Sequence, residues 1–190
     1  MNIGINDITG GIALKVEDKI YIVADYNHVK PGKGSAFVRV RLRDIKTDLV
    51  IERTYRSSEN LETVPLEEKK VQYSYKNNNT YHFMDQESFD EIAVPQESVG
   101  SAADFLQDNL VVTAVFCDNK FQKILLPNFM IVQIIETEQG IKGDSSKSSG
   151  KPAKIDTGAT VLVPLFVNVG DWVKIDTREG GGKYVERVQK

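Results

Sequence analysis

Short runs of alternating apolar and polar residues, separated by turn residues, dominate this chain of 190 residues. Four such runs fall in the first third, at residues 11–16, 20–26, 36–43 and 49–55. Side chains alternate between the two faces of a strand, so this period of two indicates strands with one buried face. Closely spaced short strands are typical of small β-barrels. The pattern predicts an all-β fold that begins with an SH3-like barrel.

The rest of the chain predicts two further small barrels. In the middle third, strands are expected at 71–76, 80–84, 110–116 and 121–125, with a helix at 98–109 capped by Ser98 or Ser101. Strands interrupted by one helix fit an OB-type barrel. The last third has apolar runs at 130–136, 159–164, 172–177 and 184–188, with a loop at 140–152, and predicts a second OB-like barrel. The expected domains are 1–63, 64–128 and 129–190.

Composition narrows the class of protein. The net charge is −3, from 24 basic and 27 acidic residues, which argues against nucleic-acid binding unless a local basic surface exists. Cys117 is the one cysteine, so no internal disulfide forms, and its apolar neighbours predict a buried structural thiol. No apolar run approaches the roughly 20 residues of a membrane helix, and no signal peptide is evident. We expect a cytoplasmic protein.

A lysine-bearing turn lies at residues 28–37. Pro31 fixes its own φ, and Gly32 and Gly34 permit positive φ, so the segment favours a turn between two strands. The geometry is that of a hairpin with Lys33 at its apex. Core packing does not explain an ammonium there, so we expect Lys33 to face a partner or a modifying enzyme.

The strand that follows this turn predicts a basic face. Arg39, Arg41 and Arg43 alternate with small or apolar residues, so the three guanidinium groups share one face at a spacing on the order of 6.6 Å. Residues 28–47 hold six basic residues and one acidic residue, a local net charge of 6 − 1 = +5. We interpret this face as a site for RNA or another polyanion, with a merely solvated surface as the alternative.

Catalytic and metal-binding patterns are not evident in the sequence. His28 and His82 are the two histidines, and neither they nor Cys117 has the spacing of a zinc site. A cluster of carboxylates at residues 85–91 is read as a solvated turn. No nucleophile, base and orienting group can be combined, so we expect a binding or positioning protein that needs no cofactor.

Ordered sequence blocks resemble bacterial elongation factor P over essentially the whole chain. The lysine turn with residues 36–39 resembles the loop of the family's first domain, and residues 81–85 with Glu87 resemble the signature of its second domain. The signature of the third domain is matched by residues 142–144, 150–153, 157–159, 163–166, 176–178 and 184–187.

This resemblance implies three β domains in an L shape like a tRNA. It implies binding to the ribosome between the P and E sites and rescue of stalling at consecutive prolines. Lys33 matches the position that reaches the CCA end of the peptidyl-tRNA, and in many members this lysine carries an extension added by a modifying enzyme. The tRNA-binding set is then Lys30, Pro31, Gly32, Lys33, Gly34, Arg39, Arg41 and Arg43. The set on the side of the mRNA and small subunit is Gly143, Asp144, Ser145, Tyr184 and Arg187. We expect a monomer.

Two departures and one alternative accompany this resemblance. The turn at residues 179–183 is about two residues longer than in the family, and Ser145 stands where threonine is common. The alternative function is a cytosolic single-stranded RNA-binding chaperone that uses its OB barrels. In that case Tyr73, Tyr75, Tyr81 and Phe83 would stack on bases.

Overall fold

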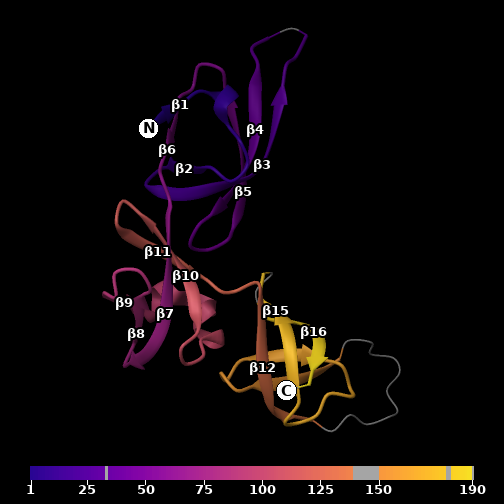
Figure 1. Cartoon of the computed structure of the whole chain (residues 1–190). Coiled ribbons are helices and arrows are strands. Elements are labelled where there is room, and N and C mark those ends of the chain that lie inside the picture. The colour runs from indigo at the N-terminus through magenta and orange to yellow at the C-terminus, as the bar shows by residue number, and fades with distance from the viewer. Residues whose placement is uncertain (33, 139–149, 179–180, 190) are drawn as a thin grey trace. The chain divides into compact units, whose positions relative to one another are not determined.

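The computed structural model describes residues 1–32, 34–138, 150–178 and 181–189 (Figure 1). Strands make up most of these residues, and the all-β prediction is confirmed. The chain divides into two compact units. The first contains Met1–Glu68 and Val115–Lys123, and the second contains Lys69–Ala114 and Ile124–Lys190.

The first sheet has the strand order β1-β6-β2-β3-β4-β5. Its elements are β1 (Asn2–Ile3), the 3-10 turn η1 (Ile5–Asp7), β2 (Ala13–Val16), β3 (Lys19–Val29), β4 (Phe37–Asp44), β5 (Val50–Arg56) and β6 (Leu61–Thr63). Its core includes Leu14, Val23, Val38, Val40 and Leu42, each at most 1% exposed. The four predicted strands are present. The polar stretch at 56–63 also contributes β6, because Leu61 is buried in this core and pairs with Ile3.

The middle sheet has the order β11-β10-β7-β8-β9. Its strands are β7 (Glu67–Asn77), β8 (Thr80–Asp85), β9 (Glu91–Pro95), β10 (Val111–Cys117) and β11 (Lys120–Leu125). The sequence did not predict β9, an edge strand that starts in the acidic cluster and ends in a proline.

The helix predicted at 98–109 is wrong in length and type. One α-helical turn, α1 (Gln96–Val99), is followed by the 3-10 helix η2 (Gly100–Phe105). Gly100 has φ of 62°, which ends the α-helical turn. The N-cap is Pro95, so neither predicted serine caps the helix. The predicted apolar face is nevertheless largely buried, at Val99, Ala102, Phe105 and Leu106.

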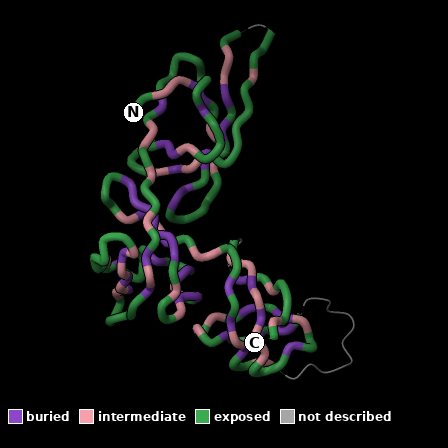
Figure 2. Tube along the Cα trace, in the orientation of Figure 1, coloured by how far each residue is buried: buried purple, intermediate pink, exposed green. Residues whose placement is uncertain are grey.

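The last sheet is a closed barrel in the order β12-β13-β14-β16-β15. Its strands are β12 (Phe129–Thr137), β13 (Lys151–Ile155), β14 (Thr160–Val163), β15 (Trp172–Asp176) and β16 (Lys183–Val188). The sequence did not predict β13, because an inward position of this strand holds Lys151 in place of an apolar residue. Buried residues follow the strands of every barrel in Figure 2.

Within the described residues, no helix has the length and apolarity needed to cross a membrane. Cys117 is 4% exposed, and burial raises the pKa of its thiol. The prediction that Cys117 is buried is therefore confirmed.

Candidate functional site: a basic hairpin on the first barrel

A long antiparallel hairpin carries the candidate site. β3 pairs with β4 from Tyr21↔Asp44 to Val29↔Phe37, so the predicted hairpin is confirmed and residues 30–36 connect its strands. Lys33 itself lies outside the described residues. Its neighbours are exposed, and Gly34 has φ of 110°, a conformation that favours glycine.

The predicted alternation along β4 is confirmed. Val38, Val40 and Leu42 are 0% exposed, and the arginines between them are exposed. Burial of the three apolar side chains fixes which face of β4 points outward, because shifting the register by one residue would reverse both faces. The core of the first barrel therefore sets the direction of Arg39, Arg41 and Arg43.

Neutral and aromatic neighbours surround the arginine nearest the turn. In register, Arg39 lies between Asn27 of β3 and Thr54 of β5. Its guanidinium carbon lies 5.8 Å from the centroid of the Phe37 ring, within the range of a cation–π interaction. The charge of Arg39 therefore has no carboxylate as a direct cross-strand neighbour.

The next two arginines have different surroundings. Arg41 lies in register between Asp25 and Glu52, so both of its direct cross-strand neighbours are carboxylates. Arg43 lies in register between Ile22 and Val50, so, like Arg39, it has no carboxylate as a direct cross-strand neighbour. The acidic neighbours of this face therefore lie beside Arg41, a difference that the one-strand pattern did not reveal.

One basic residue near the turn was missed by sequence reasoning. Arg56, at the end of β5, is the cross-strand partner of Phe37 and is exposed. Register across β4 and β5 places it on the same face as Arg39. Sequence reasoning considered β4 alone, and only strand pairing reveals this neighbour.

An aspartate holds the far end of the hairpin. Asp44 Oδ1 accepts hydrogen bonds from the backbone N–H groups of Lys46 at 2.9 Å and Thr47 at 3.0 Å. Burial by itself raises the pKa of Asp44, but these hydrogen bonds outweigh it and the pKa is lowered. The ionised carboxylate therefore stabilises the turn from β4 to β5.

Of the residues predicted for the side of the mRNA and small subunit, Tyr184 and Arg187 belong to the last barrel. Gly143, Asp144 and Ser145 lie outside the described residues. Tyr184 is half-buried against the barrel core, and Arg187 Nη1 lies 3.7 Å from a carboxylate oxygen of Asp171.

The surface required by the alternative RNA-binding function is mostly buried. Tyr73, Tyr81 and Phe83 are 8%, 7% and 1% exposed, so their rings belong to the core of the middle barrel. Tyr75 is 47% exposed, and its ring stacks on His82 with a centroid distance of 4.3 Å. One exposed tyrosine does not make the aromatic platform that single-stranded RNA binding uses.

A cavity of about 590 Å³ lies in the first unit. Its lining includes buried groups, Asp44, Cys117 and Gln122, and several lysines. Across the part of the chain that the structure describes, no group of three or more His, Cys, Asp or Glu side chains could hold a metal ion.

Three family models match the chain in order. The elongation factor P KOW-like domain matches residues 4–61, the elongation factor P OB domain matches residues 66–124, and the elongation factor P C-terminal model matches residues 130–187. Elongation factor P of Persephonella marina is 47% identical over 190 residues, with 100% of this chain and 99% of the relative covered. Elongation factor P of Caldanaerobacter subterraneus subsp. tengcongensis is 41% identical, with 98% of this chain and all of the relative covered.

A solved structure supports the fold. The eukaryotic translation initiation factor 5A from Methanococcus jannaschii has a TM-score of 0.55 and 18% identity, and the match covers 66% of this chain and 92% of that one. At this identity the likeness concerns the fold alone. The family models and the relatives matched along their full length carry the assignment, and the chain therefore belongs to the elongation factor P family of translation elongation factors.

Proposed function

We propose that this factor binds the ribosome between the P and E sites and stimulates peptide-bond formation at consecutive prolines. In this proposal Lys33 positions the CCA end of the peptidyl-tRNA. The single observation that carries it is the hairpin of β3 and β4, which bears an exposed basic face next to the turn that contains Lys33. The family assignment supports it.

The proposed chemistry is positioning. Proline reacts slowly in peptide-bond formation because its ring restricts the backbone, so a misplaced donor is a sufficient cause of stalling. Correct placement of two reactants can contribute several kcal/mol to a bimolecular step. An ammonium next to tRNA phosphate and sugar groups would supply this placement. The protein forms no bond to substrate, so it assists catalysis without being an enzyme.

The tRNA contacts divide between the turn and the strand. Lys30, Pro31, Gly32, Lys33 and Gly34 would approach the acceptor end, and Arg39, Arg41 and Arg43 would contact the RNA backbone. Contacts from arginine to phosphate fix orientation and carry no sequence information. This suits a factor that must act on many different tRNAs. Because Arg39 and Arg43 have no carboxylate as a direct cross-strand neighbour, each would contact phosphate more strongly than Arg41.

The last barrel would face the mRNA and the small subunit through Gly143, Asp144, Ser145, Tyr184 and Arg187. We assign the first domain to residues 1–63, the second to 64–128 and the third to 129–190. The factor would act as a cytoplasmic monomer. A lysine-modifying enzyme would extend Lys33, since the lysine amine is a nucleophile that can be modified.

The test is Lys33→Ala in a translation assay with a reporter that contains three successive prolines. We expect the variant to lose most of the stimulation on this reporter and to leave a proline-free reporter unchanged. The matched control is Lys46→Ala, an exposed lysine in the turn after β4. Full stimulation by Lys33→Ala would contradict the proposal.

Modification of Lys33 is tested by intact mass measurement of the protein purified from its native host, followed by fragmentation that localises any added mass.

A further inference from the structure

Two blocks of the sequence resemblance have no place in the proposed tRNA contacts: residues 157–159 and residues 176–178. Both lie in the last barrel, and both contact segments of the middle barrel or its connector. The contacts all fall within the second compact unit.

An aromatic residue of the middle barrel is buried in the last one. Phe105, the final residue of η2, is 5% exposed and belongs to the core cluster of Val132, Ile155 and Val161. Gly182 leaves the space for this ring, since a Cβ there would lie 2.9 Å from Phe105 Cε1. The buried ring therefore requires a glycine at position 182, just before β16.

The first block binds the segment around Phe105. The hydroxyl of Thr157 donates a hydrogen bond to the Asp104 carbonyl at 2.6 Å. Next to it, Gln107 Nε2 lies 3.2 Å from both carboxylate oxygens of Asp156. Asp104 precedes Phe105 in the chain and Gln107 follows it. The two contacts therefore hold both flanks of Phe105 to the turn between β13 and β14.

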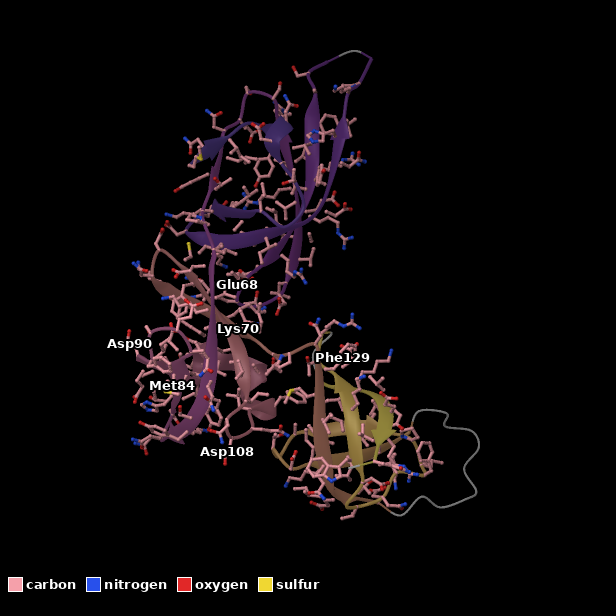
Figure 3. All side chains as sticks on the ribbon, viewed as in Figure 1. Glu68, Lys70, Met84, Asp90, Asp108 and Phe129 are labelled. Carbon is pink, nitrogen blue, oxygen red and sulfur yellow. The ribbon has the colours of Figure 1, made fainter. Side chains whose placement is uncertain are left out.

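The second block binds the connector between β11 and β12. The Thr177 hydroxyl donates to the Pro127 carbonyl at 2.5 Å, and the Thr177 N–H donates to the Asn128 carbonyl at 3.0 Å. The guanidinium carbon of Arg178 lies 5.2 Å from the centroid of the Phe129 ring. Figure 3 shows Phe129 at the start of β12, where this connector enters the last barrel.

We propose that Thr157 and Thr177 are positioning residues that together lock the middle barrel onto the last barrel, so that the two move as one rigid piece. Thr157 secures the segment around Phe105, and Thr177 secures the connector. Both contacts restrain the separation of the middle barrel from the last barrel. If one of these hydrogen bonds breaks during such a separation, the other must be strained or must break as well. The consequence for translation rests on the proposed function, since contacts at the ribosome need a fixed geometry between these barrels.

The experiment measures hydrogen exchange of the Thr177 amide in the full chain carrying Thr157→Val. This change removes one hydroxyl and keeps the side-chain shape, and Thr177 itself is untouched. A neutral hydrogen bond contributes about 1 kcal/mol, which corresponds to about fivefold faster exchange if the two contacts open together. Thr157→Ser, which keeps the hydroxyl, is expected to restore the slow rate. Thr160→Val, at an exposed position of β14, is the control.

An unchanged exchange rate at the Thr177 amide in Thr157→Val would overturn the lock. The reporter with three prolines gives a second measurement, in which the double variant Thr157→Val/Thr177→Val loses stimulation and the double serine variant retains it. Accelerated exchange with undiminished stimulation would overturn the link to translation and leave the lock standing. If Lys33→Ala had no effect on the reporter, that result would count against the proposed function. It would leave the lock unaffected, because hydrogen exchange at Thr177 is measured independently of translation.

Discussion

At the scale of single residues, all three barrels use an aspartate at the end of a strand to fix the next turn. Asp44 ends β4, Asp85 ends β8 and Asp176 ends β15. Asp85 Oδ1 accepts the N–H groups of Glu87 and Ser88 at 2.8 and 3.2 Å, which lowers its pKa. A carboxylate that accepts backbone N–H groups is favoured in its ionised form. The acidic cluster read as a solvated turn thus contains one buried structural member.

Asp176 gives a pH-dependent prediction. Hydrogen bonds from the Arg178 side chain and backbone lower the pKa of Asp176 from 3.8 to about 2. Since the folded-state pKa lies below the unfolded value, the ionised carboxylate stabilises the fold above about pH 4, and this contribution is lost as the pH falls toward 2. We expect Asp176→Asn to be less stable than wild type at pH 7.

Urea denaturation at several pH values measures this difference. The gap between wild type and Asp176→Asn is expected to narrow from pH 4 to pH 2, because the wild-type carboxyl becomes neutral over that range. Asp171→Asn is a comparison at another aspartate of the same barrel, which faces Arg187 at 3.7 Å. A gap of constant size down to pH 2 would refute the role of the Asp176 charge.

At the scale of elements, the sequence predicted the buried and exposed faces of β4 correctly. It did not predict which charges on the neighbouring strands lie beside the arginines of β4. Strict alternation of valine and arginine determines which side chains are buried, whatever strands lie beside it. The position of Asp25 and Glu52 beside Arg41 depends on pairing with β3 and β5, and these two residues are 16 and 11 positions from Arg41 in the chain. A local sequence pattern contains no information on that register.

This difference predicts unequal contributions to ribosome binding under the proposed function. Arg39→Gln is expected to weaken binding and to reduce the slope of log affinity against log salt by about one, as for a lost phosphate contact. Arg41→Gln is expected to change the slope less, because Asp25 and Glu52 lie beside Arg41 and weaken its attraction for phosphate. Affinity measured over a series of salt concentrations checks both variants. Equal slopes for the two variants would contradict this difference between Arg39 and Arg41.

The elements that sequence reasoning missed have identifiable causes. The helix was predicted from apolar spacing, which is indeed buried, but Gly100 adopts a positive φ and divides it into α1 and η2. The sequence pattern did not predict β13, because Lys151 occupies a position of this strand that faces the barrel interior. This lysine is 5% exposed, and its Nζ donates to the Glu138 carbonyl at 2.7 Å, a bond made only once the barrel closes.

At the scale of the whole molecule, the compact units do not follow the three matched domains. The tip of the hairpin formed by β10 and β11 groups with the first barrel, and Lys123 Nζ lies 2.9 Å from both carboxylate oxygens of Asp48 there. The middle and last barrels group together. Cooperative unfolding should follow these two units, because cooperativity depends on shared contacts.

Calorimetry with two core variants tests this division. Leu42→Ala removes a side chain that is 0% exposed in the first unit, and Ile155→Ala does the same in the second. Such truncations cost about 2–5 kcal/mol. We expect two thermal transitions, with Leu42→Ala lowering one midpoint and Ile155→Ala lowering the other. A single transition lowered equally by both variants would contradict the division.

The sequence by itself determined the all-β class, the lysine turn and the direction of the arginines on β4. Each of these follows from alternation, proline and glycine within a few residues, and such local constraints hold in any tertiary setting. The tertiary structure alone decided which arginine of β4 has acidic neighbours, the inclusion of β6 and β13 in their separate sheets, and the burial of Phe105 in the last barrel. These features join residues far apart in the chain, so they exist only where folding brings strands into register and side chains into a common core.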